Sequence, residues 1–262
     1  MTPPLFSLDG RSALVTGAGS PAGIGFAAAR VLAELGARVM VTSTTDRILQ
    51  RSEELLQCGV EIHGSFGDLT NEAYVASLVD ETIRWFGSID IVVNNAGMTS
   101  LSKPGMKEGG DIATLPYRVW QQSIRRNLDT AFLVCRTAIP YMVARQWGRI
   151  INIASVTGPT MAMREEPAYA ASKAGVVGLT RAIAVDHGRD GITANAVAPG
   201  WIATGSQTEH EAHEAKVTPL GRSATPAEVA SAIGWLATPG AAYTTGQCIV
   251  VDGGNSIAEE RC

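Results

Sequence analysis

The chain has little of what marks secreted, membrane-spanning or disulfide-rich proteins. Its four cysteines lie far apart without metal-type spacing, which predicts reduced thiols in a cytoplasmic protein. No stretch approaches 18 uninterrupted apolar residues, so we expect no membrane span. The first residues, MTPPLFSLDGR, lack the basic and apolar segments of a secretory signal, which agrees with a cytoplasmic location.

Positive charge and histidine are also scarce. Lys and Arg number 21 against 25 Asp and Glu, which gives a net charge of -4, whereas nucleic-acid binding requires a basic face. The four histidines are dispersed, and His210 and His213 stand in an acidic segment that is more typical of a solvated surface than of a metal site. We therefore expect neither a nucleic-acid partner nor a metal.

The chain does have a regular alternation of short apolar runs and amphipathic helical segments. Such runs indicate strands buried on both faces, as in a parallel sheet. Strands are expected at 12–16, 38–42, 89–94, 149–154, 193–198 and 248–252, and helices at 24–35, 46–57, 71–86, 116–145, 167–188 and 226–237. This order predicts an α/β fold in which residues 1–262 form a single Rossmann-type domain, a doubly wound parallel sheet with helices on both faces.

Two segments, 99–115 and 205–222, lack this regularity. Both follow a strand at the edge where open α/β sheets bind ligands. We expect substrate loops there, with a lid at about residues 205–222; solvated surface loops are the alternative.

The stretch TGAGSPAGIG joins the first expected strand to the first helix. A glycine-rich turn in this place lets backbone N–H groups approach a pyrophosphate at the positive end of the helix dipole, although glycines can also serve only a tight turn. Gly17, Gly19 and Ala22 match the G-x-G-x-x-A fingerprint. Gly17, Gly23 and Gly25 match a second pattern with a wider gap.

The second pattern is the better interpretation. Pro21 has no N–H to offer a phosphate, and the apolar stripe of the helix starts at Ile24. Gly17 then makes the turn, Ser20 is a candidate donor, and residues 23–25 enter the helix beneath the pyrophosphate.

The end of the second expected strand should select the cofactor. An NAD site carries Asp or Glu there, whereas this chain has Ser43 and Thr44, with Arg47 close by. Hydroxyls and a guanidinium favour a 2′-phosphate, so we expect NADP(H) rather than NAD(H). The alternative is that Arg47 is a solvated residue of the next helix.

The segment YAASK places Tyr169 and Lys173 four residues apart on one helix face, with Ser155 fourteen residues before the tyrosine. A cation beside the phenol would lower its pKa, as proton exchange with an alcohol or carbonyl near neutral pH requires. By itself, a surface pair on a helix would explain the same spacing.

The order of several motifs removes that ambiguity. They are the TG…GIG turn at 16–25, GD followed by Leu69, NNAG at 94–97, Asn127 in RRNLDTAF, Ser155 in INIAS, YAASK at 169–173, PGWIAT at 199–204 and TGQCIVVDGG at 245–254. Over essentially its whole length the chain resembles the classical short-chain dehydrogenase/reductase family, and within it most of all the 3-oxoacyl-acyl-carrier-protein reductases.

The resemblance implies catalytic roles. Tyr169 would be the general acid in reduction and the base in oxidation, and Ser155 would hydrogen-bond the substrate oxygen. Lys173 would bind the nicotinamide ribose and tune Tyr169, and Asn127 would hold a proton-relay water. Structurally, Ser155 could instead cap its strand, and Asn127 could satisfy buried backbone in its helix.

The resemblance also implies cofactor contacts. Asp68 and Leu69 would meet the adenine; Asn95, Ala96 and Gly97 the adenosine side; and Pro199, Gly200, Ile202 and Thr204 the nicotinamide end. Asn94 is expected to tie neighbouring strands, Thr204 could be the N-cap of a lid helix, and Trp201 is expected to form a substrate wall.

Two spacings depart from the common family pattern: five residues separate Gly17 from Gly23 instead of three, and Ser155 precedes Tyr169 by fourteen instead of thirteen. Small residues on the helix after Pro167 fit both internal packing and the subunit interface that this family usually builds into a tetramer, so we expect a homotetramer or a homodimer.

The expected function is an NADP(H)-dependent oxidoreductase acting on a carbonyl or secondary alcohol: a 3-oxoacyl thioester, a ketone or a polyol. A carrier-bound substrate would need a basic entrance, to which Arg125 and Arg126 could contribute, but the segment 209–214 is acidic. The alternative is a non-catalytic NAD(P)-binding sensor that keeps the fold.

Overall fold

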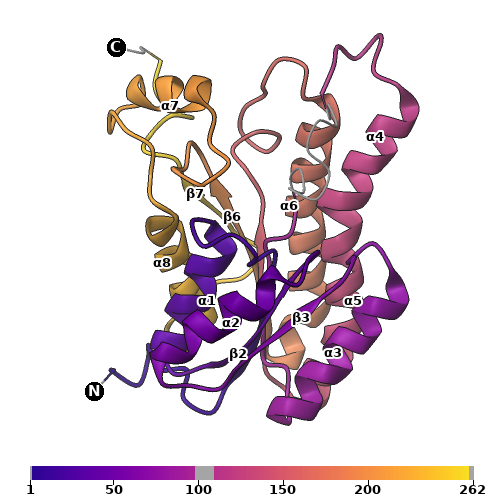
Figure 1. Cartoon of the computed structure of the whole chain (residues 1–262), viewed down its shortest axis with the longest axis vertical. Helices are drawn as coiled ribbons and strands as arrows, with labels where there is room; N and C mark the ends of the chain where they lie inside the picture. The colour runs from indigo at the N-terminus through magenta and orange to yellow at the C-terminus, as the bar shows by residue number, and fades with distance from the viewer. Residues whose placement is uncertain (1, 98–108, 260–262) are drawn as a thin grey trace.

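A seven-stranded parallel sheet forms the centre of the computed structural model, which describes residues 2–97 and 109–259 (Figure 1). The strands are ordered β3-β2-β1-β4-β5-β6-β7. Successive strands are added on one side of β1 as far as β3, and from β4 onward they are added on its other side, so the strand order reverses between β1 and β4. Their bounds are β1 Ser12–Thr16, β2 Arg38–Ser43, β3 Ile62–Phe66, β4 Ile91–Asn94, β5 Gly148–Ile153, β6 Ile192–Pro199 and β7 Cys248–Val251. The expected Rossmann-type fold is confirmed, and the reversal opens a crevice of the kind in which such sheets bind ligands.

The third strand was not expected from the sequence. β3 pairs with β2 from Val39↔Ile62 to Ser43↔Phe66 at the edge of the sheet. Only Ile62 of its five residues is buried, whereas all five residues of β1 are. An edge strand needs fewer apolar side chains, so it carries no continuous apolar run.

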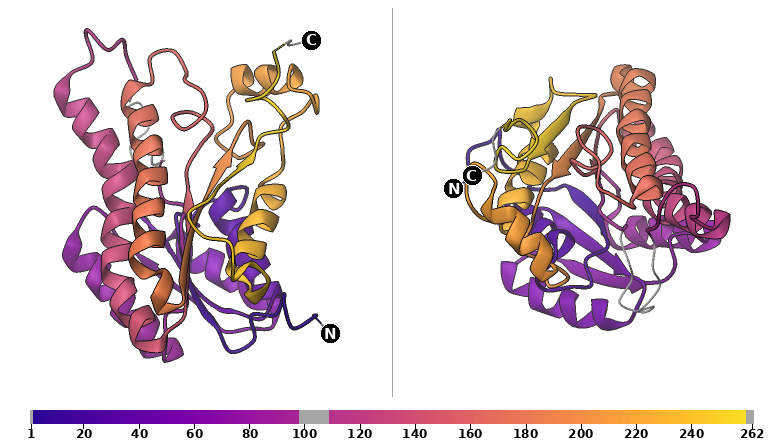
Figure 2. Two further views of the ribbon diagram at one scale, coloured as in Figure 1. Left: turned by 180° about the vertical axis from the view of Figure 1, so that it is seen from behind. Right: turned by 90° about the horizontal axis from the view of Figure 1, so that it is seen from above.

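Helices cover both faces of the sheet, as Figure 2 shows from two further directions. Their bounds are α1 Ile24–Glu34, α2 Arg47–Leu55, α3 Glu72–Phe86, α4 Tyr117–Ile124, α5 Thr130–Arg145, α6 Pro167–His187, α7 Glu209–Lys216 and α8 Pro226–Ala237. One apolar core joins α1, α2 and α8 to the sheet, and a second joins α3, α5 and α6 to its other face. Burial of these two layers fixes the sheet between them.

The segment 116–145, expected as one helix, is interrupted. Residues Arg125–Asp129 between α4 and α5 form a π-helical turn, which widens the backbone ring locally. Asn127 stands in this turn and is buried. The widened turn is a tertiary feature without a signature in the apolar periodicity.

The expected lid contains a helix. α7 lies above the carboxyl edge of the sheet (Figure 1), and its N-cap is Thr208, which forms a reciprocal capping box with Glu211. Thr204 therefore does not cap this helix, contrary to the alternative considered above. The other irregular segment falls largely outside the described residues, of which 109–115 remain.

Within residues 2–97 and 109–259, no helix combines the length and apolar character needed to traverse a bilayer.

Candidate active site

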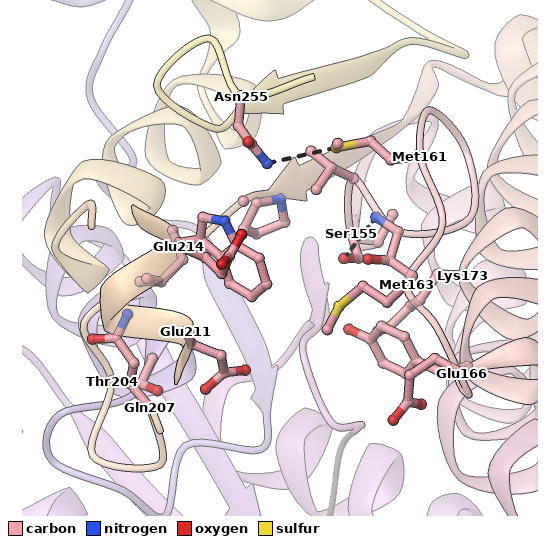
Figure 3. Close-up of a pocket in the computed structure, with 18 of the residues that line it drawn as sticks. Ser155, Met161, Met163, Glu166, Lys173, Thr204, Gln207, Glu211, Glu214 and Asn255 are labelled. Carbon is pink, nitrogen blue, oxygen red and sulfur yellow. Dashed lines mark hydrogen bonds between the residues drawn. The ribbon is translucent and has the colours of Figure 1, made fainter. Parts of the chain in front are cut away.

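A cavity of about 620 Å³ lies at the carboxyl ends of β4, β5 and β6 (Figure 3). Its walls come from the start of α1, the segment 153–166 after β5, the first turns of α6, the segment 199–207 after β6, and α7. Residues 1, 98–108 and 260–262 lie outside the described chain. The cavity gathers parts of the chain that are up to 231 residues apart, from Ile24 to Asn255.

The glycine turn at one end follows the second of the two patterns. Gly17 has φ +70°, and a Cβ on it would lie 2.8 Å from Asn95 Nδ2. A Cβ on Gly25 would lie 2.6 Å from the carbonyl oxygen of Gly17. α1 begins at Ile24 after Gly23, which offers no side-chain cap to the first N–H groups. Gly17 and Gly25 thus bring the helix end close against the strand, and the first N–H groups of α1 are available to an anion.

Asn94 and Asn95 have different structural tasks. The Asn94 amide donates to Asn152 Oδ1 at 2.8 Å and ties β4 to β5, as expected. The Asn95 amide donates to the carbonyl oxygens of Thr16 and Gly17, each at 3.0 Å. The Asn95 side chain therefore holds the glycine turn, and the backbone N–H of Ala96 joins it through the Thr16 hydroxyl at 3.0 Å.

The end of β2 carries no carboxylate. Ser43 Oγ donates to the carbonyl of Thr45 at 2.8 Å, and Arg47 Nε donates to Thr45 Oγ1 at 3.1 Å. A Cβ on Gly19 would lie 2.9 Å from Ser43 Cβ and 3.5 Å from Arg47 Nη2. The guanidinium thus lies beside Ser43 and the glycine turn, although Arg47 as a whole is exposed, as is Thr44.

The two residues expected near an adenine differ in exposure. Asp68 is exposed, and its Oδ1 accepts hydrogen bonds from the N–H and the hydroxyl of Thr70, both at 2.8 Å. The Leu69 side chain is buried in the core beneath α3. Its side chain packs the core rather than facing the cavity.

Ser155, Tyr169 and Lys173 come together on the same wall of the cavity. Ser155 follows β5, and the other two occupy the first turns of α6. The Ser155 hydroxyl shares a hydrogen bond with the Tyr169 phenol and accepts one from the N–H of Thr157 at 3.1 Å. Lys173 Nζ donates to the carbonyl of Ile153 at 2.8 Å and lies 5.6 Å from the centre of the Tyr169 ring.

The protonation of this group differs from the expectation. Burial raises the pKa of Tyr169 to about 12, and the carboxylates of Glu166 and Glu211 add to the rise, while the bond with Ser155 opposes it. Burial lowers the pKa of Lys173 to about 8. The predicted lowering of the phenol pKa is therefore wrong for the protein alone, because desolvation outweighs a cation that is itself poorly stabilised.

Asn127 reaches the same group from the π-helical turn. Its Nδ2 donates to the carbonyl of Ser123 at 3.1 Å, so part of the side chain does satisfy buried backbone. A Cβ on Gly97 would lie 2.8 Å from Asn127 Oδ1 and 3.3 Å from Lys173 Nζ. Only a glycine at 97 leaves space between these two polar groups, on the floor of the cavity.

The segment after β6 forms the other wall. Pro199 ends the strand, and the N–H of Gly200 donates to the carbonyl of Val251 at 3.0 Å. Ile202 is buried and bridges to Ala224, and the hydroxyl of Thr204 pairs with that of Ser206 at 3.1 Å. Trp201 lines the cavity, as the expected substrate wall requires.

Comparisons with known proteins agree with this geometry. A family model described as enoyl-(acyl carrier protein) reductase matches residues 17–256. A 3-oxoacyl-acyl-carrier-protein reductase of Vibrio cholerae is 38% identical over 253 residues, covering 95% of this chain and 98% of that protein. The chain belongs to the short-chain dehydrogenase/reductase family.

Two further relatives of this family are similar over nearly their full lengths. The cis-4-hydroxycyclohexanecarboxylate dehydrogenase of Sinomonas cyclohexanicum is 37% identical, covering 93% of this chain and 96% of that protein. A short-chain type dehydrogenase/reductase from Mycobacterium marinum has a crystal structure with a TM-score of 0.87 and 33% identity, covering 97% of this chain and 98% of that one. The chain is an oxidoreductase, and the alternative of a non-catalytic sensor is wrong.

The residues present fit the dinucleotide that this family uses. The first turn of α1 has no side-chain cap. Between that turn and Lys173 the surface is glycine backbone, and a Cβ at Gly17, Gly25 or Gly97 would occupy this space. This strip of bare backbone lets an extended ligand approach closely. Across the described chain, no three His, Cys, Asp or Glu side chains gather in a way that could hold a metal ion.

Several cavity residues were not recognised from the sequence. Glu166, Met161 and Met163 lie on the segment before α6. The extra residue between Ser155 and Tyr169 is the sequence feature that marks this segment as unusual. Glu214 comes from α7, and Asn255 comes from the turn after β7. Nothing in the local sequence pattern distinguishes Asn255, which follows two glycines near the end of the described chain.

Proposed function

We propose that this short-chain dehydrogenase/reductase is an NADP(H)-dependent carbonyl reductase or secondary-alcohol dehydrogenase acting on a small molecule. The observation that carries the proposal is the joint position of Ser155, Tyr169 and Lys173 on one wall of the cavity. Hydride exchange with a carbonyl requires a group that transfers a proton and a surface that holds the dinucleotide. Ser155, Tyr169 and Lys173 supply the first, and the glycine backbone beside them supplies the second.

Bound NADPH would supply the hydride, held by the glycine turn, by Gly97 and by the segment 199–204. Tyr169, with a pKa near 12, is protonated at neutral pH and can donate its proton to the substrate oxygen. Ser155 would hydrogen-bond the same oxygen and steady the negative charge as it develops. Lys173 would supply the nearby positive charge, and Asn127, next to it across Gly97, would position a proton relay.

The preference for NADP(H) rests on the end of β2. Ser43 and the Arg47 guanidinium stand side by side there, without an acidic group of the kind that selects NAD(H). A guanidinium forms strong, charge-assisted bonds with a phosphate. Arg47 would therefore bind the 2′-phosphate, with the hydroxyls of Ser43 and Thr44 nearby.

A small carbonyl or alcohol suits the cavity better than an acidic carrier protein. Relatives act on both kinds of substrate by name, a carrier-bound oxoacyl group and a hydroxycyclohexanecarboxylate. The lid carries Glu211 and Glu214 on the cavity side, and these carboxylates repel an acidic partner. Arg125 contacts the carbonyl of Thr70 and is not among the residues that line the cavity.

We further propose a cytoplasmic homotetramer or homodimer. Phe132 and Tyr141 on α5 and Val185 on α6 expose 45%, 41% and 83% of their surface, on one helical layer. Exposed apolar side chains on this layer favour association between subunits. Sedimentation velocity tests this part of the proposal, which a monomer would contradict.

The activity is tested by NADPH oxidation at 340 nm with a panel of ketones, and by reduction of NADP+ with the corresponding alcohols. Tyr169→Phe should abolish turnover while leaving the Kd for NADPH within about twofold, because the hydroxyl takes part in proton transfer. Tyr243→Phe is the matched control, since Tyr243 is fully exposed. Comparable activity in Tyr169→Phe would contradict the role assigned to Tyr169.

The cofactor preference is tested with the same assay. Arg47→Ala should raise the KM for NADPH by about tenfold or more and leave that for NADH nearly unchanged, since one charge-assisted bond is worth about 1.5–3 kcal/mol. Ser43→Asp should move the preference towards NADH, because a carboxylate repels the 2′-phosphate. An unchanged ratio of kcat/KM for the two cofactors in both variants would contradict the assignment.

A further inference from the structure

Two buried polar atoms, in residues that line the cavity, have no hydrogen-bond partner within the described chain. They are Oδ1 of Asn255 and Nε1 of Trp201, and both residues line the cavity. Buried polar groups in folded proteins are nearly always paired, so each orphan needs an explanation. Here one orphan is an acceptor and the other is a donor.

The orientation of Asn255 is fixed by its surroundings. The residue exposes only 4% of its surface, and its Nδ2 donates to the sulfur of Met161 at 3.6 Å (Figure 3). A thioether sulfur can accept a hydrogen bond but cannot donate one. The nitrogen therefore faces Met161, and Oδ1 remains as an acceptor.

The turn that carries Asn255 is rigid. Asp252 accepts hydrogen bonds from the N–H groups of Gly254, at 2.9 Å, and Ser256, at 2.7 Å. A Cβ on Gly254 would lie 2.9 Å from Pro219, three residues after the end of α7, so the turn is packed against the lid. A side chain held in this way binds a ligand without a large loss of conformational entropy.

The charges of the cavity restrict what the two orphans can bind. Glu166, Glu211 and Glu214 line the cavity against one arginine, Arg164, in addition to the catalytic Lys173. Carboxylates of this number oppose an anionic group beside them. A carboxylate ligand can only accept hydrogen bonds and an ammonium can only donate, whereas a hydroxyl does both.

From these observations we infer that the cavity is built for a hydroxylated substrate: Asn255 Oδ1 accepts a hydrogen bond from one hydroxyl group and Trp201 Nε1 donates one to another, both on carbons other than the reacting one. The substrate class is a neutral polyol or hydroxyketone rather than a plain acyl chain. This inference rests on the proposed carbonyl reductase function. An apolar chain in the same place would leave both polar atoms unpaired, and sites of this kind reject analogues that lack the hydroxyl.

The test compares 2-hexanone with its four monohydroxylated derivatives, isomers of one another that bear the hydroxyl on carbon 3, 4, 5 or 6, in the NADPH assay with the intact protein. The wild type should reduce at least one isomer with a kcat/KM about tenfold or more above that of 2-hexanone, mainly through a lower KM. Equal or higher kcat/KM for 2-hexanone than for all four isomers would overturn the inference.

Two variants assign the preference to the named atoms. Asn255→Leu keeps the approximate shape without the amide, and Trp201→Phe keeps an aromatic ring without the N–H; each should reduce the ratio of hydroxylated to plain substrate several-fold. Ser256→Ala is the matched control, because Ser256 joins the turn through its backbone N–H, and its ratio should equal that of the wild type. An unchanged ratio in both test variants would overturn the inference even if the wild type shows the preference.

Thermal unfolding of each variant establishes whether it is folded. If Asn255→Leu does not fold, the substrate ratio of Trp201→Phe alone decides the test. Reduction of 2-hexanone without any preference for hydroxyl would leave the proposed function intact and overturn this inference. No oxidation of NADPH with any ketone of the series would instead count against the proposed function itself.

Discussion

The buried ammonium of Lys173 should make the protein less stable than a variant without it. Burial lowers the pKa of this group from 10.5 to about 8, and each pKa unit corresponds to about 1.4 kcal/mol. At neutral pH the charged form therefore costs about 3 kcal/mol. Replacement by methionine removes this cost but leaves the carbonyl of Ile153 without its donor, at about 1 kcal/mol.

We expect Lys173→Met to abolish turnover and to stabilise the protein at pH 7 by about 2 kcal/mol, or roughly 5 °C in Tm for a chain of this size. The gain must depend on pH. Below pH 8 the lysine is charged in both the folded and the unfolded states, and the full cost is present. Between pH 8 and 10.5 the unfolded state binds more protons than the folded state, so the wild type gains stability relative to the variant as the pH rises.

The assay is urea unfolding of both proteins from pH 7 to 9.5 at one protomer concentration, because association contributes to stability. The stability difference should shrink by about 2 kcal/mol between pH 8 and 9.5. Titration of Tyr169 lies above this range, since its pKa is about 12. A difference that is independent of pH, or a destabilised variant at pH 7, would refute the reasoning.

Two further predictions concern charge and close packing in the site. Glu166→Gln removes a carboxylate that raises the pKa of Tyr169, so the rising limb of the pH–rate profile for alcohol oxidation should move to lower pH; a shift upward, or none, would contradict the assigned electrostatics. Gly25→Ala should weaken NADPH binding by about tenfold or more, because the new Cβ would lie 2.6 Å from the Gly17 carbonyl oxygen and force α1 away from the strand. Gly188→Ala, where a Cβ meets nothing within 4 Å, is its control, and equal NADPH affinity in the two variants would show that the close approach is not needed.

Patterns within short stretches of sequence determined most of the fold and part of the site. Continuous apolar runs predicted the central strands, because strands buried on both faces need apolar side chains at every position. Gly23 and Gly25 were placed at the start of a helix by the onset of the apolar stripe at Ile24, and α1 begins there. The i, i+4 spacing also predicted that Tyr169 and Lys173 share a helix face.

Tertiary structure decided what local patterns could not carry. The edge strand β3 draws its order from pairing with β2 rather than from its own apolar residues, and the π-helical turn at Asn127 interrupts a helix whose periodicity predicts none. The pKa of Tyr169 depends mainly on burial, and also on the carboxylates of Glu166, just before α6, and Glu211, on α7; local spacing gives neither the burial nor the approach of α7. Asn255 enters the site only because β7 ends beside the lid. The sequence alone determined which catalytic groups are present and on which elements they lie, because propensity and periodicity are local properties. Packing between distant segments determined the protonation of these groups and their neighbours, because desolvation and tertiary contacts exist only in the folded protein.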